Sequence, residues 1–138
     1  MEKIYYFFKK MDFSNLKTWN IKKLEKNKYD VKNMKGERKY IGGLKNKKPN
    51  GFGEYFSSIN HYKGTWKNGK RHGKGICKYS NGNVYYDGSW KNDFQNGMGI
   101  LFFKNKTKLY EGFLKKSLFH KKGSLYYKNG KLKDKGNF

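Results

Sequence analysis

Three histidines, one cysteine and ten scattered Asp and Glu are the side chains of this 138-residue chain best suited to serve as a base, a nucleophile or a metal ligand. His72 and His120 occur in Gly- and Lys-rich stretches that are typical of turns, where a solvated imidazole is the ordinary outcome. Cys77 has no second cysteine with which to form a disulfide or a CxxC motif. The sequence also has no HxxxH pair and no GxxxxGKS or GxxxxGKT phosphate loop. We therefore expect a protein that is not an enzyme and that holds no metal and no cofactor.

Basic side chains form the second group that could bind a ligand, because 33 Lys and Arg oppose only 10 Asp and Glu, a formal net charge of +23. Such a charge favours a polyanionic partner: a phospholipid surface, a nucleic acid or an acidic protein. An A/T-rich genome is a second explanation, since Lys, Asn, Tyr, Phe and Ile all have A/T-rich codons and all are frequent here. Nucleic acid is the weakest of the three partners, because Arg, the preferred bidentate phosphate ligand, occurs only at Arg38 and Arg71.

An internal repeat indicates which elements position these side chains. Segments that begin at Tyr40, Tyr62, Tyr86 and Tyr110 share a pattern of Gly two residues later, Trp or Leu four residues later, and Gly thirteen residues later, and the first three also have Gly eleven residues later. Lys121 replaces one of these glycines in the fourth copy. The remaining framework residues are Gly42, Gly51 and Gly53, then Gly64, Trp66, Gly73 and Gly75, then Gly88, Trp90, Gly97 and Gly99, and finally Gly112 and Gly123.

The spacing within each copy predicts a β-hairpin. Tyr, Gly and Trp at alternate positions, with polar residues between them, are typical of a half-buried strand. A turn rich in Asn, Gly and Lys follows, and we expect the second strand to open at the last framework glycine, which is Gly75 in the second copy. Glycine inside a strand is costly, so the glycine after each Tyr should leave room for rings from neighbouring strands. Because one hairpin cannot bury its ring-bearing face alone, the copies should stack.

The second copy, with Tyr62, Gly64, Trp66, Gly73 and Gly75, resembles the consensus of the MORN (membrane occupation and recognition nexus) repeat, and the resemblance extends over about residues 40–129. It implies an all-β fold: an elongated, single-layer, twisted antiparallel sheet of tandem β-hairpins. It also implies a structural adaptor that holds partner proteins at a membrane-linked or cytoskeletal assembly. Members of this family have been linked to phosphoinositides, so the resemblance implies direct binding of acidic phospholipids as the alternative.

The repeats divide the chain into two parts. Residues 1–28 form an N-terminal non-repeat segment, and residues 29–138 form the array, with clear repeats from 40, 62, 86 and 110 and partial units at 29–39 and 134–138. Ser14 could cap a short helix that contains Leu16, Trp19 and Leu24. We expect this segment, with the rings among residues 4–8, to cover one face or one end of the sheet. A homodimer or a partner interface is the alternative cover.

The repeat register sorts the candidate binding residues into two groups. Basic residues near the predicted turns form an anionic-ligand strip, at Lys45, Lys47, Lys48, Lys67, Lys70, Arg71, Lys74, Lys115, Lys116, Lys121 and Lys122. Apolar residues form a protein-docking or packing surface, with Ile100, Phe102, Phe113 and Tyr126 on the face opposite the rings and Phe94, Leu118 and Phe119 in exposed turns. An apolar patch on a one-layer sheet must be covered or must bind something.

Three functions follow, in order of preference. The first is a scaffold for partner proteins, the second is binding of acidic phospholipids through the basic turns, and the third is binding of nucleic acid or a ribonucleoprotein by rings that stack on bases. The apolar run from Ile4 to Phe8 is too short for a signal-peptide core or a membrane span. We therefore expect a cytoplasmic protein, peripheral to a membrane or associated with the cytoskeleton.

Overall fold

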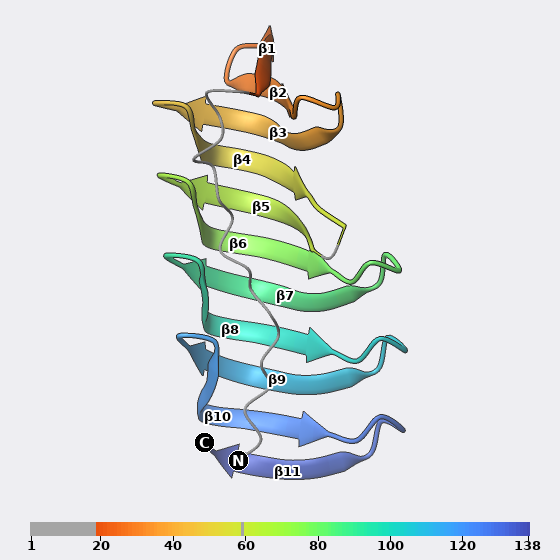
Figure 1. Cartoon of the computed structure of the whole chain (residues 1–138). Helices are drawn as coiled ribbons and strands as arrows, with labels where there is room; N and C mark the ends of the chain where they lie inside the picture. The colour runs from red at the N-terminus through yellow and green to blue at the C-terminus, as the bar shows by residue number, and fades with distance from the viewer. Residues whose placement is uncertain (1–18, 59) are drawn as a thin grey trace.

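The protein forms one sheet of eleven antiparallel strands, in which each strand pairs with its neighbours in the sequence (Figure 1). The computed structural model describes residues 19–58 and 60–138, so the predicted cap residues 4–8, Ser14 and Leu16 lie outside the described residues. The strands are β1 (Asn20–Glu25), β2 (Lys28–Lys32), β3 (Arg38–Lys45), β4 (Lys48–Phe56), β5 (His61–Lys67), β6 (Lys70–Lys78), β7 (Val84–Lys91), β8 (Phe94–Phe102), β9 (Lys108–Lys115), β10 (Leu118–Tyr126) and β11 (Leu132–Asn137). The predicted fold class is confirmed. None of the described residues forms a helix with the length and apolarity that a membrane crossing requires.

Each clear repeat is one hairpin, β3–β4, β5–β6, β7–β8 or β9–β10, and each is closed by a two-residue turn. The turn residues have positive φ, for example 50° at Asn68 and 79° at Gly69, which is the conformation of a type I′ turn. Turns of this type follow the right-handed twist of the strands and favour Asn and Gly. The second strand therefore begins directly after the turn, at Lys70 in the second copy. Our prediction that it opens at Gly75 was wrong, because that glycine lies well inside the strand.

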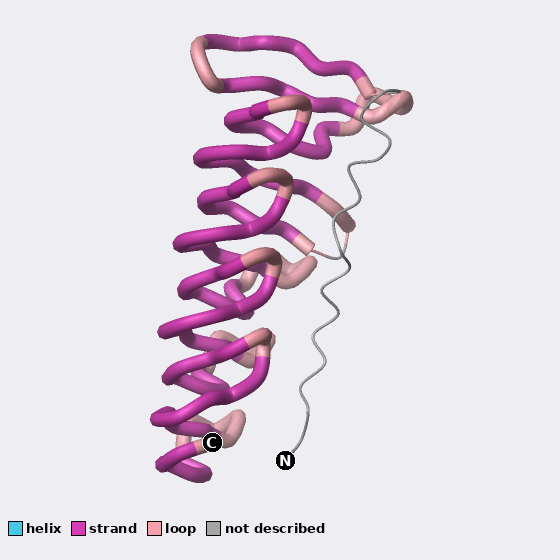
Figure 2. Tube along the Cα trace, turned by 90° about the vertical axis from the view of Figure 1, so that its left-hand side faces the viewer, coloured by secondary structure: helices cyan, strands magenta, loops and turns pink. Residues whose placement is uncertain are grey.

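The second strand of each repeat hairpin contains a bulge, and the hairpins curl in side view (Figure 2). At the bulge, Gly51, Gly73 and Gly97 have φ values of 80°, 87° and 98°, in the region that favours glycine. Lys121 occupies the same place in the fourth hairpin with φ of 55°. The one departure from the repeat pattern thus keeps a left-handed backbone, at a cost of about 1 kcal/mol for a residue with a Cβ.

A continuous row of glycines crosses the sheet from β3 to β11. Its members are register partners in consecutive strands: Gly42, Gly53, Gly64, Gly75, Gly88, Gly99, Gly112, Gly123 and Gly136. The ring of Tyr62 lies over Gly64 and Gly75, and a Cβ added at Gly75 would overlap that ring. We call the face that carries these Tyr rings the inner face and the opposite face the outer face.

Each of these rings belongs to the strand that carries the first glycine of its pair, and not to a neighbouring strand as we predicted. The hydroxyl explains this arrangement, because Tyr62 Oη donates a hydrogen bond of 2.8 Å to the carbonyl of Thr65, three residues along the same strand. The other three hairpins repeat this bond at 2.7 Å. Burial raises the pKa of Tyr40, Tyr62 and Tyr86 well above the ordinary value, so these hydroxyls remain donors.

Trp66 and Trp90 join each hairpin to the one before it. Nε1 of Trp66 donates to the carbonyl of Gly53 at 3.1 Å, and Nε1 of Trp90 donates to the carbonyl of Gly75 at 3.2 Å. The ring of Trp66 also lies edge-on to the ring of Tyr62, with 4.9 Å between centroids. The core is therefore a row of Tyr and Trp rings along the inner face, and stacking of hairpins provides the burial that one hairpin lacks.

The described part of the N-terminal segment, residues 19–28, departs from our prediction of a short helix. β1 and β2 form a further hairpin, so Leu24 lies in a strand with 44% of its surface exposed and not in a short helix. The predicted boundary between residues 28 and 29 falls at the start of β2. Asn27 has φ of 59°, as in the other turns, and Val31 of β2 is the register partner of Tyr40. The sheet extends to residue 20 because residues 20–32 have a hairpin turn of their own and contain Val31, an apolar register partner for Tyr40.

Candidate binding surfaces

The cysteine and the three histidines lie on three strands, β5, β6 and β10. Cys77 is fully buried on the inner face, and burial raises the pKa of its thiol to about 11, so the thiol is protonated at neutral pH. His72 and His120 lie in β6 and β10 and not in turns as we predicted, because the turns are shorter than the glycine spacing indicated. Nε2 of His61 lies 3.6 Å from Oε1 of Glu54. Within residues 19–58 and 60–138, no three His, Cys, Asp or Glu side chains gather where they could hold a metal ion.

Arg71 does not belong to the predicted anionic-ligand strip, because it is buried. Its side chain is only 1% exposed, and its guanidinium carbon lies 4.5 Å from the centroid of the Trp90 ring. Its Nε lies 3.1 Å from Oδ1 of Asp93, which also accepts a hydrogen bond of 2.8 Å from the Arg71 backbone N–H. Arg71 is the register partner of Trp66, so it points to the inner face. Its charge is neutralised and shielded from solvent, and an external anion cannot reach it.

The two-residue turns lie along one edge of the sheet, on the left in Figure 1. Exposed lysines occur in these turns and at the strand ends beside them. Two pairs face each other across the turns, since Lys45 is the register partner of Lys48 and Lys67 is the register partner of Lys70. Like charges directly opposite each other destabilise a hairpin, so these pairs favour an anion at this edge. The last residue of the first strand is an exposed lysine in every repeat hairpin, at Lys45, Lys67, Lys91 and Lys115.

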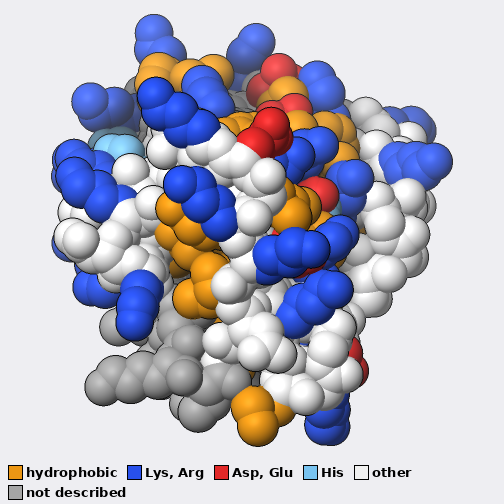
Figure 3. Space-filling view, turned by 90° about the horizontal axis from the view of Figure 1, so that it is seen from above, with side chains coloured by type: hydrophobic (Ala, Val, Ile, Leu, Met, Phe, Trp, Pro, Cys, Tyr) orange, Lys and Arg blue, Asp and Glu red, His pale blue; other side chains and the backbone are white. Residues whose placement is uncertain are grey.

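The other lysines of the predicted strip are divided between the turn edge and the faces. Lys47 and Lys116 lie in turns, whereas Lys74, Lys121 and Lys122 lie farther along the second strands. Figure 3, a view onto the β1 end, shows Lys and Arg side chains around the outline of the molecule and few acidic ones. Basic residues are therefore not confined to one edge.

The outer face changes its chemistry between the second and the third repeat hairpins. Apart from His72 and Asn96, which lie in the bulges, three of four outward positions of β6 are basic, and the matching positions of β8 are all apolar. In order, these residues are Lys70, Lys74, Ile76 and Lys78 in β6 and Phe94, Met98, Ile100 and Phe102 in β8. Phe94 is 47% exposed and Met98 is 46% exposed. We call Lys70, Lys74 and Lys78 the basic strip and the four residues of β8 the apolar strip.

The apolar surface continues onto β9 and β10. Phe113 is the register partner of Met98 and is 41% exposed, Leu118 is 55% exposed, and Tyr126 is half-buried. Phe94 and Leu118 are the first residues of strands and not turn residues. Our prediction that Phe119 is an exposed turn residue was wrong. Its ring stacks on that of Tyr110 with 3.9 Å between centroids. Met98 was missed, although alternation from Ile100 could have placed it on this face.

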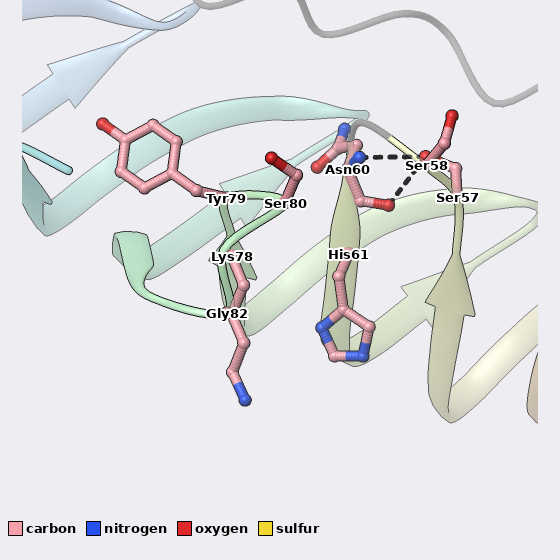
Figure 4. Close-up of a pocket in the computed structure, with 8 residues that line it drawn as sticks. All are labelled: Ser57, Ser58, Asn60, His61, Lys78, Tyr79, Ser80 and Gly82. Carbon is pink, nitrogen blue, oxygen red and sulfur yellow. Dashed lines mark hydrogen bonds between the residues drawn. The ribbon is translucent and has the colours of Figure 1, made fainter.

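A pocket of about 410 Å³ lies at the sheet edge opposite the turns, between the β4–β5 and β6–β7 connections (Figure 4). The first two repeats start 22 residues apart, at Tyr40 and Tyr62, and the next starts 24 residues later, so the β4–β5 connection is shorter and leaves this space. In Figure 4 the side chains of Lys78 and His61 point away from the hydroxyls of Ser58 and Ser80, so the lining does not converge on a ligand. The lining residues are Ser57, Ser58, Asn60, His61, Lys78, Tyr79, Ser80 and Gly82.

Comparison with known proteins gives one family match. The family model of the MORN repeat matches residues 40–59, 62–84 and 86–108, which are three consecutive hairpins. No curated protein matches the chain significantly. Among solved structures, the chain is similar to a crystal structure of an S. aureus TarM mutant in complex with Fondaparinux, alpha-GlcNAc-glycerol and UDP, at 12% identity and a TM-score of 0.22. That match covers 86% of this chain and 19% of the other, so this chain spans about a fifth of its length, and so low a TM-score supports no argument about function.

Proposed function

This chain is a MORN-repeat protein, and from that premise we propose that it is a non-enzymatic scaffold that binds partner proteins, at a membrane-linked or cytoskeletal assembly. The observation that carries the proposal is the apolar surface on the outer face of β8 to β10, where Phe94, Met98, Phe113 and Leu118 are each 41% to 55% exposed. Burial of apolar surface contributes about 25 cal/mol per Å², and exposed apolar patches mark interaction sites. The inner face cannot play this role, because its rings already pack the hairpins together.

A variant with a polar outer face should lose partners that a control variant keeps. The test variant is Met98→Ser with Phe113→Ser, and the control is Phe52→Ser, a residue of the outer face of β4 that is 60% exposed. The immobilised proteins are incubated with extract of the source cells, and the retained proteins are quantified by mass spectrometry. We expect proteins held by the unmodified chain and by the control to fall about ten-fold or more with the test variant. Equal retention by all three chains would contradict the proposal.

A second candidate function is binding of an acidic phospholipid surface by the turn edge. It is supported by the exposed lysine at the end of the first strand in every repeat hairpin, and by the two opposed pairs of lysines described above. An anionic leaflet relieves the repulsion within such pairs and attracts each lysine by about 1 kcal/mol.

Neutralising the turn edge should release the protein from phosphoinositide vesicles. The test variant carries Lys45→Gln, Lys67→Gln, Lys91→Gln and Lys115→Gln, and its control carries Lys104→Gln, Lys106→Gln, Lys128→Gln and Lys131→Gln at the opposite edge, so both lower the net charge from +23 to +19 (23 − 4). Co-sedimentation uses phosphoinositide vesicles and phosphatidylserine vesicles of equal total charge, with a short RNA as competitor. We expect the test variant to lose about a hundred-fold in vesicle partition and the control about ten-fold or less. Equal losses, or displacement by RNA from both kinds of vesicle, would mean that the charge is unspecific.

A further inference from the structure

We propose that the outer face of β6 to β8 binds an acidic amphipathic α-helix of a partner protein. The apolar side of the helix lies on the apolar strip of β8, and its carboxylates face the basic strip of β6. This inference rests on the proposed scaffold function and specifies the class of partner segment.

The two strips have the dimensions of a helix. They run along strands that are separated by β7 alone, so they lie about 10 Å apart, which is about the diameter of an α-helix with its side chains. β8 has nine residues and a bulge, so it is at most about 30 Å long, the length of a helix of at most about 20 residues. A helix laid over β7 can thus place one flank over each strip.

The side chains of β7 fit a helix in this orientation. Ser89 and Lys91 point outward on β7 and are not apolar, so these two residues add nothing to the apolar strip of β8. Asp87 is exposed and lies between Ile76 and Ile100 in the register. Because this carboxylate repels acidic groups over the centre of the site, the carboxylates of the helix belong over the lysines of β6 and not over β7.

Charge selects an acidic partner over the other occupants of this face. Within the part of the chain that the structure describes, Lys70, Lys74 and Lys78 form no ion pair with a carboxylate. A second copy of a chain with a net charge of +23 would bring more positive charge to this strip. Residues 1–18 of the chain contain four Lys against two acidic residues, so that segment is also net positive and is poorly matched to the basic strip.

A designed peptide tests the inference directly. The probe is a fluorescent peptide of about 18 residues with Leu at the i, i+3, i+4 and i+7 positions of a helix and Glu on the opposite side. Its two controls are a scrambled peptide of the same composition and a peptide in which Lys replaces Glu. Binding is measured by fluorescence anisotropy at roughly 150 mM salt. We expect the acidic amphipathic peptide to bind the full chain at least about ten-fold more tightly than either control peptide.

Variants of the two strips test whether the peptide binds there. Phe94→Ser with Met98→Ser, and separately Lys70→Gln with Lys74→Gln, should each weaken binding of the acidic peptide by about ten-fold. Phe52→Ser and the charge-matched pair Lys104→Gln with Lys106→Gln should change it by less than about two-fold. All of these side chains are exposed, so thermal unfolding should remain unchanged and shows that each variant is folded.

The outcomes separate this inference from the scaffold function. Equal binding of the scrambled peptide, or equal loss with the control variants, would overturn the helix site, because it would show charge attraction without a defined surface. Absence of peptide binding, together with extract partners that depend on Met98 and Phe113, would overturn the helix site and leave the scaffold function standing. A failure of both experiments would remove the scaffold function itself.

Discussion

Alanine at Gly99 should lower the free energy of unfolding by about 3 kcal/mol, whereas alanine at Gly136 should change it by less than about 0.5 kcal/mol. Both glycines belong to the row that crosses the sheet, and neither has a positive φ, so the backbone accepts alanine at both places. The two positions differ in the room that they leave for a Cβ atom. A Cβ at Gly99 would overlap the ring of Tyr86, and a Cβ at Gly136 would have no atom within 4 Å.

The Tyr86 ring cannot move aside without loss. It is completely buried, its hydroxyl donates to the carbonyl of Ser89 at 2.7 Å, and its centroid lies 5.2 Å from that of the Trp90 ring. The Cβ therefore either expels the ring or separates β7 from β8. Urea unfolding of the Gly99→Ala and Gly136→Ala variants measures the difference.

A double-mutant cycle identifies the ring as the cause. Tyr86→Ala removes the ring and should be destabilising alone, but adding Gly99→Ala to it should cost little, because the Cβ then has room. We expect a coupling energy of about 2 kcal/mol between the two sites. Additive effects would show that Gly99 is needed for a reason other than the ring.

The repeat and the fold class could be predicted from the sequence because Tyr, Gly and Trp recur with strand alternation, and the family model matches three of the four clear copies. The hairpin turns could not, because glycine has three separate uses in one copy. Gly69 forms the turn, Gly73 forms the bulge with φ of 87°, and Gly75 has extended backbone beneath the ring of Tyr62. Spacing alone does not distinguish these uses, so the turn was predicted too long. The pair Asn68–Gly69 was the local signal for a two-residue turn.

The error in the turn also explains what was wrong in the candidate site. With a long turn, Arg71 and Phe119 are turn residues and exposed; with a two-residue turn, they lie opposite Trp66 and Leu114 and point inward. Arg71 was predicted to bind anions because it is basic. The sequence does not show that Asp93, 22 residues away, neutralises its charge. Ile100 was placed correctly on the outer face, because the alternation from Gly99 does not depend on the length of the turn.

Removing the carboxylate of Asp93 should lower the free energy of unfolding by about 3 kcal/mol or more, because Asp93→Ala leaves the buried guanidinium of Arg71 without its carboxylate partner. The next hairpin supplies a matched control. Ser117 holds the place of Asp93, and its Oγ accepts a hydrogen bond of 3.1 Å from the backbone N–H of Gln95, which holds the place of Arg71. Ser117→Ala removes a neutral hydrogen bond and should cost only about 1 kcal/mol.

The two hairpins therefore have different residue pairs at equivalent positions, charged Arg71–Asp93 in one and neutral Gln95–Ser117 in the other. We expect the pairs to be exchangeable. Arg71→Gln combined with Asp93→Ser copies the neutral Gln95 and Ser117 pair, and the double variant should recover most of the stability that Asp93→Ala loses, since buried ion pairs are often replaceable by neutral groups. Chemical unfolding of the single and double variants measures the recovery. If the double variant is as unstable as Asp93→Ala, the guanidinium stabilises the stack through its contact with the Trp90 ring, 4.5 Å away, and the carboxylate serves only to hold it there.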